Sequence, residues 1–177
     1  MPTRLVLIRH GQSLWNAARR WQGHADVPLS ELGREQAHET ARALAGHRFH
    51  GLYASDLQRA LETARIVGTP HGLVPMIEPR LRELDIGDWE GLVRPEIEAR
   101  WPETLARFDA EDPHVRPTGG ETFAELEARV REALTDLCAR HAADAKLAVV
   151  AHGGVLAAVT GRFGHANAEA VELDWPA

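Results

Sequence analysis

The sequence has almost no cysteine and no long apolar run, and both absences exclude classes of protein. Its single cysteine, Cys138, cannot form an internal disulfide and supplies no cysteine cluster of the kind that binds zinc. No stretch is long and apolar enough to span a bilayer. The start of the chain, MPTRLVLIRHG, is a poor signal peptide because its apolar run is short. We therefore expect a cytoplasmic protein without a membrane partner.

Basic charge and several catalytic motifs are also scarce. The formal net charge of −6 disfavours a general nucleic-acid binder. The chain has no HExxH pair, P-loop or GxGxxG turn, and the residues around Ser13 do not form a GxSxG elbow. His47 and His50 have no evident third metal ligand near them. We therefore expect neither nucleic acid, nor a metal ion, nor an organic cofactor.

What is present favours one α/β domain over residues 1–177. Hydrophobic residues make up 44% of the chain, which is ordinary for a globular protein and enough for a core. Strand-like runs alternate with helix-like segments, an order typical of a three-layer α/β/α sandwich. Its sheet is expected to be mostly parallel, with helices on both faces. The predicted strands are 4–9, 51–55, 73–77, 146–154 and 171–175.

Three predicted helices carry capping signals at their first residues. Ser30 can cap one helix, while Ser55 with Gln58, and Thr122 with Glu125, have the spacing of capping boxes. Apolar residues then recur at helical spacing, which predicts one buried face on each helix. Behind Ser30 that face is predicted to consist of Leu32, Ala37, Ala41 and Leu44.

Two predicted strands end in the same way. The runs LVLIRHG at 5–11 and AVVAHGG at 148–154 both pass from apolar residues directly into His-Gly. Ligand sites in parallel sheets lie beyond the carboxyl ends of the strands, so His10 and His152 are predicted to meet there. An imidazole beside arginines suits phosphoryl transfer: a neutral ring nitrogen can attack phosphorus, and a guanidinium can bind two phosphate oxygens.

The stretch LIRHGQS resembles the signature of the histidine phosphatase superfamily, in the branch similar to cofactor-dependent phosphoglycerate mutase. Further blocks that resemble this family follow in its order, so the resemblance covers most of the chain. A single RHG triplet would be a weak signal, whereas six ordered blocks are a strong one. The other five are WQGHADVPLSELGREQA (21–37), SDLQRALETA (55–64), LRELDIGDWEG (81–91), PTGGETFAELEARV (117–130) and VVAHGG (149–154).

The resemblance implies catalytic roles for five residues. His10 would be the nucleophile that forms a covalent phosphohistidine. Arg9, Arg59 and His152 would surround the phosphoryl group in transfer. Glu83 would protonate the leaving oxygen and later help to activate water.

Four more residues are implied in binding the substrate. Asn16, Gln22 and Gly23 would help to form the phosphate pocket with side-chain and backbone donors. Gly153 could offer a backbone N–H at the start of a helix, although a simple turn glycine explains it nearly as well. Trp21 and Trp89 could line the pocket or simply bury area.

The family contains both mutases and phosphatases, and the resemblance favours a phosphatase. Its mutases have a longer middle segment and a C-terminal tail, whereas here 25 residues follow His152 and the segment from Glu83 to Gly119 is short. The expected activity is hydrolysis of a small phosphorylated metabolite, without a metal. The alternatives are phosphoglycerate mutase activity, a phosphoprotein phosphatase and a phosphate-recognising binding module.

The last predicted strand raises the question of self-association. An exposed sheet edge near Val171–Trp175 could pair with a second copy of the chain. A homodimer is therefore a possible partner arrangement.

Overall fold

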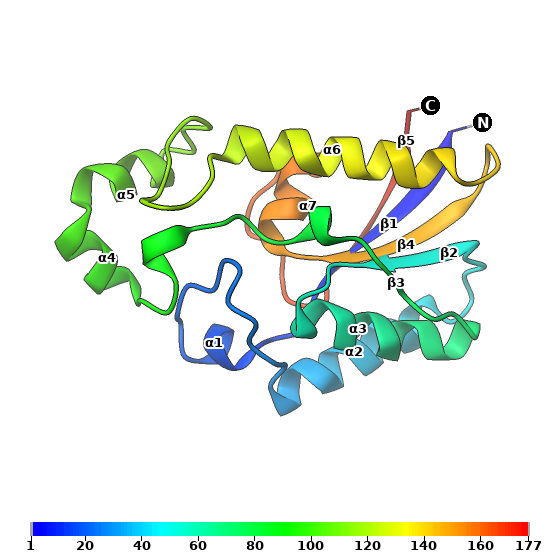
Figure 1. Cartoon of the computed structure of the whole chain (residues 1–177). Helices are drawn as coiled ribbons and strands as arrows, with labels where there is room; N and C mark the ends of the chain where they lie inside the picture. The colour runs from blue at the N-terminus through cyan, green and yellow to red at the C-terminus, as the bar shows by residue number, and fades with distance from the viewer. Residues whose placement is uncertain (1, 177) are drawn as a thin grey trace.

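A computed structural model describes residues 2–176 and contains one five-stranded sheet. The strand order is β3-β2-β4-β1-β5, with β1 to β4 parallel and β5 antiparallel to β1 (Figure 1). This arrangement confirms the predicted mostly parallel sheet. The strands are β1 (Thr3–Arg9), β2 (Gly51–Ala54), β3 (Met76–Ile77), β4 (Lys146–Ala151) and β5 (Ala170–Trp175).

Helices cover both faces of the sheet, and a further helical pair lies beyond it (Figure 1). The α-helices are α1 (Leu14–Ala17), α2 (Glu31–Leu44), α3 (Gln58–Gly68), α4 (Arg94–Arg100), α5 (Pro102–Asp109), α6 (Phe123–Ala139) and α7 (Gly153–Thr160). Short 3-10 turns are η1 (Thr69–His71), η2 (Pro79–Leu81) and η3 (Gly87–Trp89).

Alternate residues of the central strands supply two separate cores. Leu5 and Leu7 of β1 pack with α6 and α7, whereas Val6 and Ile8 pack with α2 and α3. Successive side chains of a strand point to opposite faces, so one apolar run serves both layers. Each buried Leu or Ile contributes about 1.5–3 kcal/mol. The predicted three-layer sandwich is confirmed.

The helix behind Ser30 differs from its predicted face at one position. Ser30 caps α2 by accepting a hydrogen bond from the Gly33 N–H at 3.0 Å, as predicted. Leu32, however, is 47% exposed, so its place in the predicted buried face is wrong. Gly33 is buried instead, because a Cβ there would lie 2.0 Å from the Gln12 carbonyl oxygen. At Gly33, the backbone of the loop after β1 therefore packs directly against α2, in place of a side chain.

The predicted capping box of Ser55 and Gln58 is also wrong. The chain bends at Asp56 and Leu57 after β2, and Leu57 precedes α3 without a side-chain cap. Asp26 takes the capping role from a distant loop, since its Oδ1 accepts the Gln58 N–H at 2.7 Å. Local spacing cannot reveal a cap supplied from another segment. The Thr122 capping box of α6, by contrast, forms as predicted.

The topology opens a crevice between β1 and β4. These strands are hydrogen-bonded neighbours, but the chain leaves β1 towards α2 on one face and β4 towards α7 on the other. Such a switch point is where open α/β sheets bind ligands. At the far side of β1, β5 is an edge strand, and its pairing with a second copy stays a prediction. Within residues 2–176, no helix combines the length and apolarity needed to cross a membrane.

Candidate active site

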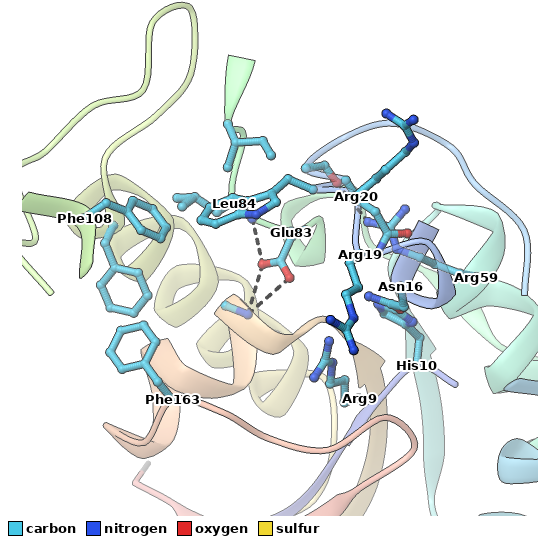
Figure 2. A pocket seen from close by; sticks show the side chains of 16 residues that line it. Arg9, His10, Asn16, Arg19, Arg20, Arg59, Glu83, Leu84, Phe108 and Phe163 are labelled. Atoms are coloured by element: carbon cyan, nitrogen blue, oxygen red, sulfur yellow. Dashed lines mark hydrogen bonds between the residues drawn. The ribbon is translucent and has the colours of Figure 1, made fainter. Parts of the chain in front are cut away.

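A cavity of about 400 Å³ lies at the carboxyl ends of β1 and β4 (Figure 2). His152 and Gly153 are not among the side chains that line it. The His152 ring lies beside that of His10, with ring centroids 5.1 Å apart, so the two strand-end histidines do meet. Seven of the nine predicted site residues line the cavity: Arg9, His10, Asn16, Gln22, Gly23, Arg59 and Glu83.

The His10 imidazole is held in one tautomer. It is buried, and its Nδ1 lies 2.6 Å from the Gly11 carbonyl oxygen. A carbonyl can only accept, so Nδ1 carries the proton and Nε2 keeps its lone pair. Burial, followed by the positive charges of Arg59 and Arg9, holds the pKa of His10 well below 6.5. The ring is therefore a neutral imidazole with a free nitrogen.

Gly11 allows the backbone after His10 to pass against α2. A Cβ at Gly11 would lie 2.2 Å from the Gly33 carbonyl oxygen, so no other residue fits without moving the helix. The Gly11 N–H donates to the Thr63 hydroxyl at 3.1 Å, which ties the turn to α3. This packing explains why glycine follows the histidine in the opening motif.

Several buried nitrogens near His10 have no hydrogen-bond partner within residues 2–176. They are the Nε atoms of Arg9 and Arg59 and both ring nitrogens of His152. The Nη1 and Nη2 atoms of Arg59 donate to Ala25 and Gly23 carbonyls at 2.7 and 2.8 Å, which fixes the guanidinium in place. Buried polar groups are normally paired, so these nitrogens, with their neighbouring positive charges, suit an anionic ligand. Burial lowers the pKa of Arg59 to about 10, and the group stays charged at neutral pH.

Glu83 faces the cavity from the loop between η2 and η3. Its Oε1 accepts the N–H groups of Gly154 at 3.0 Å and Leu84 at 2.9 Å (Figure 2). A Cβ at Gly154 would lie 2.3 Å from Oε1, so the contact requires glycine. Sequence reasoning chose Gly153, but it is the next residue, Gly154, that lines the cavity and touches Glu83. The N–H of Gly153 as a phosphate donor stays a prediction.

Arg129 of α6 fixes the backbone that carries Glu83. It donates to the carbonyl oxygens of Arg80, Arg82 and Glu83 at 2.7, 2.8 and 2.8 Å. The His24 Nε2 also donates to the Glu83 carbonyl oxygen, at 2.9 Å. Sequence reasoning named neither residue, although both belong to blocks that resemble the family. Their target is a backbone atom, and no spacing rule identifies such a contact.

The loop after β1 forms the wall beside the arginines. Asn16 Oδ1 accepts the Ser13 N–H at 3.0 Å, and the Ser13 hydroxyl donates to Gln22 Oε1. Gly23 has φ of +51°, and a Cβ there would lie 2.6 Å from atoms of Glu90 and Ile86. These contacts bring Asn16, Gln22 and Gly23 to the cavity in one rigid turn.

Sequence reasoning missed much of the remaining wall. Trp21, for which it left both interpretations open, lines the cavity, whereas Trp89 is fully buried in the core. Arg19, with φ of +54°, and Arg20 add two exposed cations. The other residues not predicted are Leu84, Ile86, Phe108, Phe123, Gly154 and Phe163. Within residues 2–176, no three His, Cys, Asp or Glu side chains are grouped to hold a metal ion.

The fold and this cavity define a class of α/β protein in which a neutral imidazole lies among buried arginines and a carboxylate, an arrangement suited to an anionic ligand. The comparisons with known proteins narrow the class. The profile of the histidine phosphatase superfamily (branch 1) matches residues 5–174. The chain belongs to this superfamily, as its motifs predicted.

Individual relatives are similar over most of their length. A glucosyl-3-phosphoglycerate phosphatase of Mycobacterium tuberculosis is 39% identical over 164 residues, covering 89% of this chain and 73% of that protein. The phosphoglycerate mutase-like protein 4 of Arabidopsis thaliana is 39% identical over 155 residues, covering 86% of this chain and 67% of that protein. A solved mycobacterial glucosyl-3-phosphoglycerate phosphatase with VO3 superposes with a TM-score of 0.90 at 37% identity, covering 97% of this chain and 92% of that one.

The depressed pKa of His10 predicts its protonation state directly. An imidazole in a histidine peptide becomes charged as the pH falls through about 6.5. We expect the His10 ring to remain neutral at pH about 6, because burial and two neighbouring arginines oppose its charge. Carbon-13 NMR of histidine-labelled protein, with the resonance assigned by His10→Asn, measures this. A His10 signal that titrates together with the free peptide would contradict it.

Proposed function

We propose that this chain hydrolyses phosphomonoesters through a phosphohistidine at His10. The observation that carries the proposal is the tautomer of His10, whose proton is on Nδ1 and whose Nε2 lone pair is free. A substrate phosphate would bind to the unpaired nitrogens of Arg9, Arg59 and His152, with Asn16 beside them. The names of the phosphatase relatives support the same activity.

The reaction then has two steps. Nε2 of His10 attacks phosphorus in line, and the bond to the leaving oxygen breaks as Glu83 gives that oxygen a proton. Water next attacks phospho-His10, with the Glu83 carboxylate accepting its proton, and inorganic phosphate leaves. Arg9 and Arg59 stabilise the negative charge on the equatorial oxygens in both steps. Gln22, Gly23 and Gly153 are proposed to complete the pocket.

A small metabolite is the substrate that we favour over a phosphoprotein. The cavity of about 400 Å³ has the size of a small-molecule site. Leu84, Ile86 and Phe108, from the segment between Glu83 and Gly119, form part of its wall. A concave site with such a wall would hinder a protein surface from reaching His10.

The test is release of inorganic phosphate from a panel of phosphomonoesters. We expect turnover that is undiminished in EDTA, because the two arginines provide the positive charge that a metal would otherwise supply. Loss of activity in EDTA, restored by a divalent ion, would contradict the metal-independent route. Isomerisation of phosphoglycerate without release of phosphate would identify a mutase instead. Stoichiometric binding of phosphomonoesters with no turnover would identify a binding module.

A further inference from the structure

Three phenylalanines from separate segments form one apolar wall of the cavity. Phe108 lies in the last turn of α5, Phe123 begins α6, and Phe163 follows α7. The rings of Phe123 and Phe163 have centroids 5.1 Å apart, and the Phe108 ring lies 5.4 Å from that of Trp21. Phe163 is 44% exposed and lines the cavity, so its ring is accessible to a ligand there. We call these three residues the phenylalanine wall.

The wall lies on the side of the cavity where the leaving group must be. Figure 2 shows Phe108 and Phe163 on one side of the Glu83 carboxylate, with Arg9 and His10 on the other. In-line displacement places the leaving oxygen opposite the attacking nitrogen. Because the proposed acid Glu83 must reach that oxygen, the rest of the leaving group extends past Glu83 towards the wall.

A second, smaller cavity adjoins the main one and shares the phenylalanine wall with it. The phenylalanine wall lines it too, together with Val115 and three acidic residues, Asp109, Glu111 and Asp112. Asp109 is paired with Arg94, and Asp112 with Arg107. The exposed Glu111 has no such ion pair within residues 2–176. This end of the cleft is therefore apolar with an acidic rim, which disfavours an anionic group.

The cations are gathered at the opposite end. Arg9, Arg19, Arg20 and Arg59 line the main cavity but not the smaller one. The cleft thus has a cationic end for phosphate and an aromatic end for an uncharged group. A polar, multiply charged leaving group would leave Phe163 and its neighbours uncovered.

We infer that the preferred substrates are phosphomonoesters whose leaving group carries an uncharged aromatic ring, stacked on the phenylalanine wall. This inference rests on the proposed phosphatase function and adds the substrate class. Edge-to-face contact between aromatic rings stabilises binding beyond the burial of their area. The preference would come from binding of the aromatic ring, and it would be independent of the reaction at phosphorus.

The experiment compares substrates that differ in shape but not in leaving-group chemistry. Naphthylmethyl phosphate and ethyl phosphate both release a primary alcohol, so Glu83 faces a similar task with each. We expect kcat/KM to be about tenfold or more higher for the naphthylmethyl ester. Equal values, or a preference for glycerol phosphate, would overturn the inference while leaving the phosphatase function intact. No phosphate release from any ester would contradict the proposed function itself.

A variant of the exposed ring locates the preference. Phe163→Ala should lower kcat/KM for naphthylmethyl phosphate by about tenfold and leave ethyl phosphate within about twofold. The matched control is Val74→Ala, since Val74 is 83% exposed and lines neither cavity. Equal losses on both esters would mean that Phe163 does not select substrates.

Inhibition of the unaltered protein provides a check that needs no variant. Naphthylmethylphosphonate should inhibit about tenfold more strongly than methylphosphonate, because only the former reaches the phenylalanine wall. Similar inhibition by the two phosphonates would overturn the inference even if Phe163→Ala failed to fold.

Discussion

His10→Ala is expected to lower kcat by about 10⁴-fold or more, because it removes the proposed nucleophile and the remaining groups cannot form the covalent intermediate. The unaltered protein, mixed briefly with an aryl phosphate and quenched without acid, should gain the mass of one phosphoryl group. Mass spectrometry of the intact chain measures both proteins in parallel. The adduct should be absent from the variant and should be lost from the unaltered protein on acid treatment.

The control for this experiment is His114→Ala, since His114 is exposed and lies outside the cavity. It should keep full turnover and the same adduct. Turnover without an adduct in the unaltered protein would mean that hydrolysis outruns its formation, and faster quenching resolves that case. Turnover that persists in His10→Ala would remove His10 from the mechanism, because no other step we propose can replace its attack.

The second large effect concerns Glu83 and depends on the leaving group. Glu83→Gln should reduce kcat/KM for ethyl phosphate by about 10³-fold, within the usual contribution of a general acid. The same variant should lose far less on nitrophenyl phosphate, whose leaving oxygen needs no proton in the transition state. Glutamine keeps the shape of the side chain and an oxygen for the Gly154 and Leu84 N–H groups. Steady-state kinetics on both esters measures the difference.

Two further observations sharpen the test of Glu83. Glu121→Gln is a suitable control, since Glu121 lies in an ion pair with Arg129 and does not line the cavity. It should change both activities only slightly, because Arg129 keeps its hydrogen bonds to the backbone carbonyls that hold Glu83 in place. If Glu83→Gln also reduced both esters equally, Glu83 would not be the acid.

Sequence reasoning succeeded where the structure depends on strands and on short contiguous motifs. The two apolar runs that end in His-Gly place His10 and His152 together because parallel neighbours end at the same edge. Arg59 reaches the same edge from the first turn of α3. The fold and the meeting of the two histidines therefore follow from local pattern and the rules of parallel sheets, whereas the family resemblance implied Arg59 and Glu83.

Prediction from the sequence failed where a contact between distant segments decides whether a residue is buried or caps a helix. The exposure of Leu32 depends on how closely the loop after β1 approaches Gly33, and the missing cap at Ser55 depends on Asp26. Phe163 shows no periodicity that marks it as part of a cavity, since it lies in a loop after α7. Contacts between loops distant in sequence leave no signature in the spacing of either loop.

The phenylalanine wall stands apart from the groups proposed for the chemistry. His10 and His152 extend from buried central strands, so a change around them disturbs the core and costs stability. Phe163 is on the surface, where most substitutions are tolerated. Proteins with this fold can therefore change their specificity for phosphate esters through surface substitutions alone, while the residues around His10 and His152 stay the same.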